Sequence, residues 1–349
     1  MAFGQSREGI LSASVGPLVS VITPAFNHES FIGACIESVL SQTYPHWEQI
    51  IIDDGSTDRT RELVREYSDL RIRLVEQPHQ GIEALASTYN RALSTAKGSL
   101  IAILEGDDTW PTDKLATMVA VFRDPGTVLA FGDAHDMDDK GVVANWRTRT
   151  SRSRALLPKS IFFNDPVRSA TSYLLSSGGQ SFIPPSTVVI RRNALESIGG
   201  FQHVTGIGPV DVPTFARLSL MGKFGYFPQV LGYRRRHLNS ATVQYLEPMS
   251  NTARDFALAA ATDSVFGLTA AERKSVEESW RATPFTAAFW LGRICLINGH
   301  TKEARRHFAA AMGARDFRMV LASVIGWGLS WARCDMEGLA RFAGQSTLK

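Results

Sequence analysis

The sequence TPAFN at residues 23–27 closes the β-rich run Leu18–Thr23, and DDGSTD at residues 53–58 closes a second such run, Gln49–Asp53. Between them, apolar residues recur with helical spacing from Phe31 to Leu40. A strand, a helix and a second strand in this order predict a right-handed crossover and parallel pairing. Both segments then end at the same edge of one sheet. At that edge, open α/β sheets bind their ligands.

The alternation of strands and helices continues along the first half of the chain. The spacing predicts further helices at Asp58–Tyr67, Ile82–Ala96 and Arg192–Ile198, and further strands at Ile72–Glu76, Leu100–Leu104 and Phe182–Ile190. We therefore expect an α/β fold, with a mostly parallel nucleotide-binding sheet covered by helices on both faces. Residues Asp138–Gly179 lack a clear period and are expected to form a long loop or lid.

The chain changes character near residue 245. Residues 1–245 are expected to form one catalytic domain, and residues 246–349 an all-helical, Ala-rich extension. Residues 285–315 resemble one tetratricopeptide-type hairpin, but a single copy does not make a stable array. We expect a helical cap on the sheet domain rather than an independent binding module. The apolar run Met319–Ala332 is shorter than the roughly 20 residues that span a bilayer, so a packed helix is expected.

Composition excludes several classes of protein. The 349 residues carry 20% charged side chains and a net charge of +3, which argues against a disordered polyelectrolyte and gives no reason to expect nucleic acid binding. Cys35, Cys295 and Cys334 lie far apart and cannot build a disulfide framework. The first 16 residues lack a secretory signal pattern. These features favour a reducing cytoplasm.

The two strand-end segments carry groups suited to a nucleotide. Pro24 fixes a turn that can present backbone to a base, and Asp53 and Asp54 can accept hydrogen bonds from a base N–H or from ribose hydroxyls. A turn followed by a helix cap is the alternative, and it accounts for Gly55 and Ser56. Because a cap needs only one side chain, the doubled carboxylate predicts ligand contact.

A second acidic segment, LEGDD at residues 104–108, directly follows the fourth predicted strand. The carboxylates Glu105, Asp107 and Asp108 repel one another unless a cation or a donor-rich ligand lies among them. A divalent Mg²⁺ or Mn²⁺ bridged to a diphosphate would relieve that repulsion and stabilise the departing nucleotide. A solvated acidic turn before the helix predicted at Pro111–Phe122 is the alternative.

Together these segments resemble glycosyltransferase family 2, whose members have the GT-A fold. The resemblance covers about Leu18–Ser240 and rests on residues 20–27, residues 51–58, residues 104–108, and Gly81, Asn90 and Gly98. It implies a nucleotide-sugar donor, usually a UDP-sugar, a divalent cation, and inversion at the anomeric carbon. It also implies a glycan or lipid-linked acceptor.

The resemblance assigns roles to individual residues. It places the metal on Asp107 and Asp108, with Glu105 where an aspartate is usual, and it makes Asp211 the general base. Helix capping is the alternative role for Asp211, because Val210 replaces the usual neighbouring glutamate. The expected nucleotide-sugar contacts are Pro24, Ala25, Phe26, Asn27, Asp53, Asp54, Gly81, Asp107, Arg235 and His237. For Arg235 and His237, a solvated basic turn is equally compatible with the sequence.

Other readings of the sequence remain open. The unusual Glu105 and Val210 would suit a catalytically impaired nucleotide- or glycan-binding scaffold with a partner-binding tail. Nucleotidyl transfer and dehydrogenation find less support, because the chain lacks a Gly-rich phosphate loop and a GxGxxG after the first strand. Arg147–Arg154 and the apolar helix near Val320 could contact an anionic membrane face. A solvated loop and a core helix are the readings we prefer for them.

Overall fold

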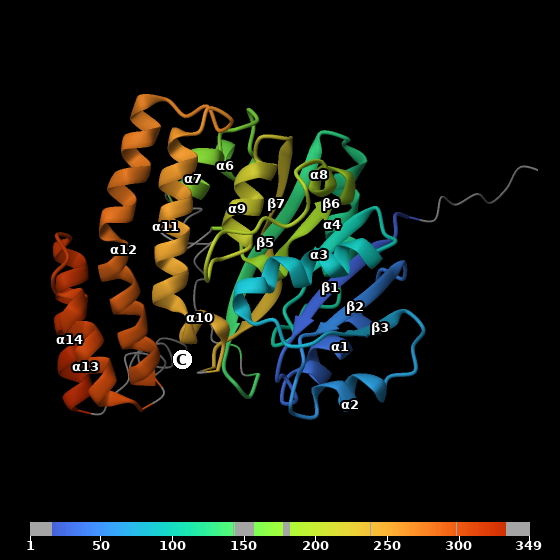
Figure 1. The fold of residues 1–349 in the computed structure, drawn as a ribbon, viewed down its shortest axis with the longest axis horizontal. Coiled ribbons are helices and arrows are strands. Elements are labelled where there is room, and N and C mark those ends of the chain that lie inside the picture. The colour runs from blue at the N-terminus through green and yellow to red at the C-terminus, as the bar shows by residue number, and fades with distance from the viewer. Residues whose placement is uncertain are drawn as a thin grey trace, which may run out of the picture.

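The computed structural model describes residues 16–141, 143, 157–176, 182–237, 239–297 and 299–332. A seven-stranded sheet forms its centre, and a layer of long helices stands beside the sheet (Figure 1). The strands are β1 (Val19–Ala25), β2 (Trp47–Asp53), β3 (Ile72–Glu76), β4 (Leu100–Ile103), β5 (Thr127–Met137), β6 (Val189–Arg191) and β7 (Lys223–Arg235). Their order in the sheet is β3-β2-β1-β4-β6-β5-β7.

The sheet is mostly parallel, as the sequence predicts. Strands β3, β2, β1 and β4 pair in parallel, and so do β5 and β7. Strand β6 alone is antiparallel, to both β4 and β5. The carboxyl ends of β1, β2 and β4 therefore lie side by side. This places the three ligand-binding segments predicted from the sequence at one edge.

Helices cover both faces of the sheet because each central strand is apolar on both sides. In β2, Ile50 and Ile52 face one buried cluster and Ile51 faces the other, and all three are fully buried. The helices before the extension are α1 (Ile32–Leu40), α2 (Thr60–Arg65), α3 (Leu85–Thr95), α4 (Lys114–Val119), α6 (Lys159–Phe163), α7 (Thr171–Leu175), α8 (Arg192–Ser197) and α9 (Asp211–Leu218). Short 3-10 turns add η1 (Ile82–Ala84), η2 (Ala120–Arg123) and η3 (Pro185–Thr187).

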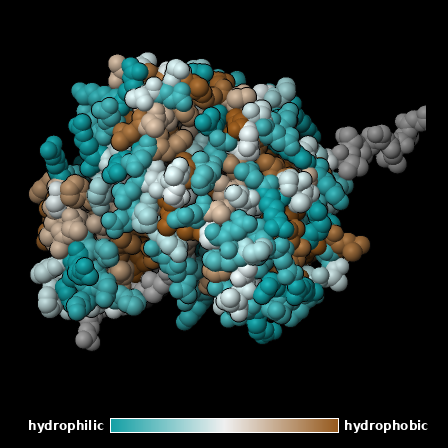
Figure 2. All heavy atoms as spheres, viewed as in Figure 1, coloured by the Kyte–Doolittle hydropathy of each residue, from teal (hydrophilic) through white to brown (hydrophobic). Residues whose placement is uncertain are grey.

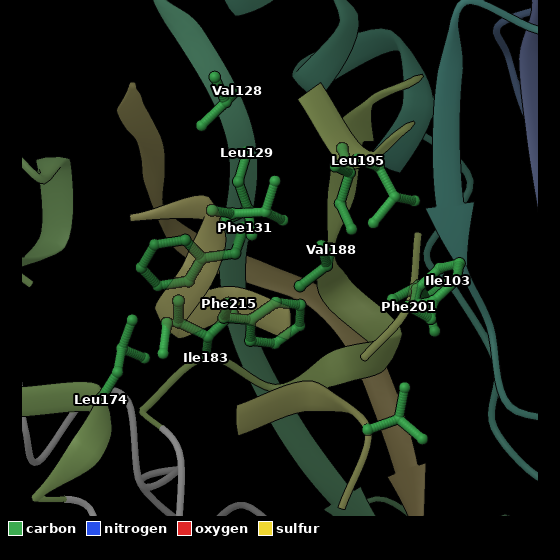
Figure 3. Close-up of a cluster of buried hydrophobic side chains, with 14 of the residues drawn as sticks. Ile103, Val128, Leu129, Phe131, Leu174, Ile183, Val188, Leu195, Phe201 and Phe215 are labelled. Carbon is green, nitrogen blue, oxygen red and sulfur yellow. The ribbon is translucent and has the colours of Figure 1, made fainter. Parts of the chain in front are cut away.

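The larger buried cluster extends along one face of the sheet, from Ile50 of β2 to Phe224 of β7. Phe131 of β5, Phe215 of α9, Ile183 and Val188 point toward one another in its centre (Figure 3). Phe131 and Phe215 are fully buried. Burial of each such side chain contributes about 1.5–3 kcal/mol of transfer free energy. This cluster fixes α9, and so the position of Asp211 at its first residue.

Two sequence predictions in the middle of the chain were wrong. The strand predicted at Phe182–Ile190 begins only at Val189, because Pro184 and Pro185 cannot donate to a strand ladder and instead open η3. The segment expected to be a loop or lid contains α6 and α7, which bury Phe162 and Leu174 in the main core. The arginine cluster at 147–154 lies outside the described residues.

Strands β5 and β7 were not predicted at all. Strand β7 contains Gly225, Pro228 and Gly232, residues that normally argue against a strand. It accommodates them through a bulge: Phe227 pairs with Gly132, while the next paired residue, Val230, faces Asp133. Because the bulge shifts the register within β7, the strand does not show a regular period of two in its sequence.

The C-terminal region is helical, as predicted. Its helices are α10 (Ala241–Gln244), α11 (Leu246–Thr262), α12 (Ala270–Ile297), α13 (Thr301–Ala311) and α14 (Phe317–Trp331). Ala257 of α11 and Trp280 of α12 belong to the same buried cluster as Phe215, and Trp280 Nε1 donates to Leu175 O at 2.7 Å. The extension is thus packed onto the sheet domain. The boundary at residue 245 and the tetratricopeptide character of residues 285–315 stay predictions.

Candidate active site

The first two strand-end segments are joined by hydrogen bonds. The Asn27 N–H donates to Ser56 Oγ at 2.9 Å, and the Thr57 N–H donates to Asn27 Oδ1 at 2.8 Å. Asn27 has a φ of +54°, a left-handed conformation that asparagine tolerates better than most residues. Asn27 therefore holds the two loops together, and its side-chain oxygen is already engaged.

Asp53 and Asp54 have different surroundings. Asp54 accepts from the side-chain amide of Gln77 at 2.6 Å and from the N–H groups of Gln80 and Gly81 at 3.1 and 3.2 Å, so it fixes the loop after β3. Asp53 accepts from the Ser56 N–H through Oδ1, which also lies 3.7 Å from Arg61 Nε, whereas its buried Oδ2 has no hydrogen-bond partner among the residues that the structure describes. A buried unpaired acceptor is costly, so Asp53 is the carboxylate with capacity for a ligand donor.

An aromatic pair lies next to these carboxylates. Phe26 stacks on His79, with ring centroids 4.1 Å apart and an interplanar angle of 19°. Phe26 is 39% exposed. The pair offers a flat surface beside Asp53, and His79 is held there because its Nδ1 lies 3.0 Å from Asp54 Oδ2.

The acidic segment packs tightly against the first strand-end segment. A Cβ on Gly106 would lie 2.5 Å from His28 Nδ1 and 2.9 Å from the carbonyl oxygen of Pro24. Only glycine allows the two backbones to approach so closely. Glu105, Asp107 and Asp108 are thereby brought to the edge formed by β1 and β2.

The three carboxylates of this segment do not converge on one point. Glu105 Oε1 accepts from the Tyr89 hydroxyl, and Asp107 Oδ2 lies 3.0 Å from His237 Nε2. Asp108 accepts from the Ser186 hydroxyl and, at 2.8 Å, from the Arg235 N–H. Within the described ranges, no three His, Cys, Asp or Glu side chains gather closely enough to hold a metal ion by themselves. The metal site expected on Glu105, Asp107 and Asp108 stays a prediction.

The local environment separates the charges of these groups. Burial, reinforced by Asp107 and Asp108, raises the pKa of Glu105 to about 8 despite its hydrogen bond from Tyr89. Burial and the neighbouring Asp107 also raise the pKa of Asp108. Burial would raise the pKa of Asp107 too, but the hydrogen bond with His237 and the charges of His28 and His237 outweigh it and lower the pKa. Asp107 is therefore the carboxyl of this segment that ionises most readily.

The basic residues 234–236 at the end of β7 make two separate sets of contacts. Arg235 is 6% exposed, and its guanidinium donates to the carbonyl oxygens of Asp107, Asp138 and Asp139 at 2.8–3.1 Å. Arg235 thus stabilises the backbone of the acidic segment at residues 104–108. Arg234 and Arg236 instead clasp the carboxylate of Asp136 at 2.8 and 3.2 Å. Burial alone would raise the pKa of Asp136, but these two arginines hold it well below its usual range.

One cavity of about 330 Å³ collects these groups. Asp107, Asp211 and Arg234 line it, together with His28, Glu105, Asp108, Ser186 and Arg236. Asp211 is the first residue of α9, as predicted, and burial raises the pKa of its carboxyl. Helices α11 and α12 of the extension close the other side with Leu246, Met249, Trp290 and Ile294. The cavity thus combines charged side chains of the sheet domain with apolar side chains from both the sheet domain and the extension.

Of the nucleotide contacts expected from the sequence, those at the carboxyl ends of β1 and β2 gather with Gly81, whereas His237 and Arg235 lie with the acidic segment. Sequence reasoning missed Tyr89, His79, Ser186, Arg234 and Arg236 as partners. Ser186 lies within the strand predicted at residues 182–190, and Arg234 directly precedes the predicted Arg235. Nothing in the sequence pairs Tyr89 with Glu105 or His79 with Phe26, because these contacts arise only when separate loops meet.

Solved structures show that the fold is of the GT-A type, as the sequence predicts. The mannosyltransferase PcManGT from Pyrobaculum calidifontis, solved with GDP-Man and Mn²⁺, matches with a TM-score of 0.55 at 20% identity, over 91% of this chain and 81% of that one. Residues 1–349 of TarS from S. aureus, solved with UDP-GlcNAc, match with a TM-score of 0.55 at 14% identity, over 90% and 88% of the two chains. At these identities the likeness concerns the fold.

The sequence then defines the family. The model of glycosyl transferase family 2 matches residues 20–199, just over half of the chain, and the chain belongs to this family. TuaG of Bacillus subtilis (strain 168) is 41% identical over 117 residues, which cover 33% of this chain and 46% of TuaG. The Escherichia coli UDP-Glc:alpha-D-GlcNAc-diphosphoundecaprenol beta-1,3-glucosyltransferase WfgD is 36% identical over 129 residues, or 37% of this chain and 50% of WfgD. These alignments span about half the length of each relative.

Proposed function

We propose that the chain transfers a sugar from a nucleoside diphosphate sugar, most simply a UDP-sugar, to a hydroxyl of a glycan or lipid-linked acceptor, with inversion at the anomeric carbon. The observation that carries the proposal is that one cavity is lined by Asp107, Asp211, Arg234 and Arg236 and by apolar side chains of the helical extension. Family membership supports transfer from a nucleotide sugar. WfgD, whose name gives UDP-glucose as donor and a diphosphoundecaprenol-linked sugar as acceptor, supports the acceptor class.

The nucleoside is assigned to the edge formed by β1 and β2. The unpaired Oδ2 of Asp53 would accept a base N–H, which removes the cost of leaving that buried atom without a partner. The exposed face of Phe26 would lie along the base or ribose. Pro24, Ala25 and Gly81 shape this part of the site through their backbone, and Asn27 and Asp54 hold its loops in place.

The donor set at Asp107 fits a divalent cation shared with a diphosphate. Asp107 Oδ2 and His237 Nε2 lie 3.0 Å apart, so a carboxylate and an imidazole are close enough together to hold one ion that also takes phosphate oxygens. We assign the ion to this pair, with phosphate oxygens and water as its other ligands, and give Asp108 and Glu105 supporting roles. When bound, Mg²⁺ or Mn²⁺ would neutralise charge on the departing diphosphate.

Asp211 is the group assigned to activate the acceptor. An inverting transfer needs a base on the face of the sugar opposite the leaving group. Asp211 enters the cavity from α9, whereas Asp107 enters it from the loop after β4. Burial raises the pKa of the Asp211 carboxyl, and a higher pKa makes its carboxylate a stronger proton acceptor. Arg234 and Arg236 add positive charge to the same cavity.

A donor screen with metal tests the function. The purified chain is incubated with UDP-, GDP- and dTDP-sugars, each with Mn²⁺, with Mg²⁺ or with EDTA, and release of the nucleoside diphosphate is followed. We expect one donor to be hydrolysed slowly in the presence of metal, and faster once a suitable acceptor is added. Binding of a nucleotide without turnover of any donor under any of these conditions would contradict the proposal and favour a binding scaffold.

The apolar side chains that the extension contributes to the cavity are assigned to the acceptor, because they line the same cavity as Asp211 and come from helices outside the sheet domain. Trp290 lies in α12, with Arg293 packed over its ring at 4.6 Å from the centroid. We expect Trp290→Ala to raise the KM for the acceptor about tenfold or more, because an aromatic ring in a substrate pocket contributes on the order of 1–3 kcal/mol. Hydrolysis of the donor alone should stay unchanged. Steady-state kinetics with and without acceptor measures both.

Trp290→Phe is the matched control. It keeps an aromatic face and should restore most of the affinity for the acceptor. If Trp290→Ala instead weakened the donor and the acceptor equally, the tryptophan would be a general support of the fold and not part of an acceptor wall.

A further inference from the structure

Helix α14 exposes a continuous apolar face. Phe317, Leu321, Val324, Ile325 and Trp331 are between 47% and 75% exposed, and their spacing places them on one side of the helix. Brown and tan atoms lie at the left edge of Figure 2, where Figure 1 places α14. The expectation of a packed core helix at residues 319–332 therefore holds for only one side of it. Contiguous exposed apolar surface of this kind marks an interaction site.

The side of α14 that packs onto the protein consists mainly of small residues, with Leu329 as a partly buried apolar one. Ser323 and Ser330 are fully buried, and a Cβ on Gly326 would lie 2.5 Å from Phe308 Cζ of α13. A surface helix normally buries its large apolar residues and exposes its polar ones. In α14 the small residues are buried and the large apolar residues are exposed. The large apolar side chains contribute little to the contact that anchors the helix, so the fold itself does not explain them.

Positive charge surrounds this face. Arg315 and Arg318 are exposed where the helix begins, and the Arg305 guanidinium lies 4.2 Å from the ring centroid of Trp331 where it ends. Residues 301–332 contain five Lys or Arg and two acidic residues. One of the acidic residues, Asp316, caps α14 by accepting from the Arg318 N–H at 2.9 Å. Large apolar and aromatic side chains bordered by arginine are typical of helices that lie in a membrane interface.

The geometry argues against two other environments. At about 1.5 Å per residue, the 15 residues of α14 reach about 22 Å, short of the roughly 30 Å hydrocarbon core. Among the residues with described structure, no helix meets the length and hydropathy of a membrane span. A second copy docked with its α14 parallel would bring Arg315 and Arg318 toward their own counterparts, and one docked antiparallel would bring them toward Arg305, which lies over Trp331 at the other end of the helix. An anionic surface pairs with the same arginines favourably.

We propose that the exposed face of α14 docks the chain on an anionic lipid bilayer, with Phe317, Leu321 and Ile325 inserted among the headgroups. This inference is independent of the proposed function, because it concerns a face that takes no part in the cavity. If both hold, docking would bring the cavity to the surface that carries lipid-linked sugars.

Vesicle flotation tests the docking. The full-length chain is mixed with vesicles of phosphatidylcholine alone or of equimolar phosphatidylcholine and phosphatidylglycerol. We expect binding to the anionic vesicles that weakens as salt rises, and little binding to the neutral ones. The triple variant Phe317→Ser, Leu321→Ser, Ile325→Ser should bind at least about tenfold more weakly, since it removes the apolar groups that insert. Arg315→Gln with Arg318→Gln should reduce binding to anionic vesicles only.

The control is Leu70→Ser, which removes an apolar side chain that is 97% exposed on the sheet domain. It should bind like the wild type. Thermal unfolding checks that each variant is folded. Failure of the wild type to bind anionic vesicles, or equal binding by the triple variant, would overturn the proposal. So would a wild-type dimer that the triple variant converts to a monomer without any vesicle binding, because the face would then belong to a second copy.

Discussion

Replacement of Asp107 by Asn should lower kcat/KM for sugar transfer by at least about a thousandfold, because the charge stabilisation expected of a bound metal ion amounts to several kcal/mol. Asn keeps the shape of the side chain but removes the charge that faces His237 at 3.0 Å. Added Mn²⁺ should tighten UDP binding by the wild type and have little effect on the variant. Coupled assays of nucleotide release and calorimetry with UDP measure the two effects.

The matched control is Asp113→Asn. Asp113 is exposed in the same part of the chain, and its side chain makes no capping hydrogen bond to α4. This variant should keep full activity. If Asp107→Asn retained activity within tenfold of the wild type, the cation would not be held at this carboxylate. If the wild type bound UDP and Mn²⁺ together but turned over no donor, the scaffold reading would replace the enzymatic one.

Asp211→Asn is expected to lower kcat by a factor of about 10² to 10⁴, the usual contribution of a general base, with little change in KM for the donor. The base works only when it is deprotonated, so the rate should rise with pH through the pKa of Asp211. Burial raises that pKa, and the acid limb of the wild-type profile should therefore lie above the ordinary aspartate value. The limb should be missing from the variant. Rate profiles in overlapping buffers measure it.

Stability gives a second readout for the same substitution. A carboxyl whose pKa is raised on folding is favoured in its neutral form, so its charge destabilises the folded chain once the pH exceeds both pKa values. Asn is neutral at every pH. Asp211→Asn should therefore be at least as stable as the wild type at neutral pH while it is nearly inactive. Asp255→Asn, at an exposed position of α11, is the control for both measurements. Loss of activity together with loss of stability would indicate a structural role.

The first half of the fold could be predicted because its strands are short, apolar and regularly spaced. The run at Ile50–Ile52 is buried on both faces, which is what a central parallel strand requires. The second half follows different rules. Strand β7 passes through Gly225, Pro228 and Gly232 with the help of a bulge, and Pro184 and Pro185 shorten β6. In each instance the local structure depends on pairing with a neighbouring strand or on packing in the core. The local sequence pattern could not predict it.

The site divides in the same way. The carboxyl ends of β1, β2 and β4 could be predicted to meet, because parallel topology alone brings them together. The side-chain partners could not, since Tyr89 and His237 reach the acidic segment from elements far away in sequence. The clearest difference is Arg235. Its expected role was to contact phosphate, whereas its guanidinium holds backbone carbonyls, including that of Asp107.

The shared core of sheet and extension limits how the chain can be dissected. Trp280 and the alanines of α11 fill the same interior as Phe215. A truncation after residue 245 would leave that interior open to water and uncover the Leu175 carbonyl, which accepts from the Trp280 indole. Unfolding of the two regions should consequently be one cooperative event. Any attempt to graft a new helical tail onto this chain would have to rebuild part of its larger hydrophobic core, because the present tail shares that core with the sheet.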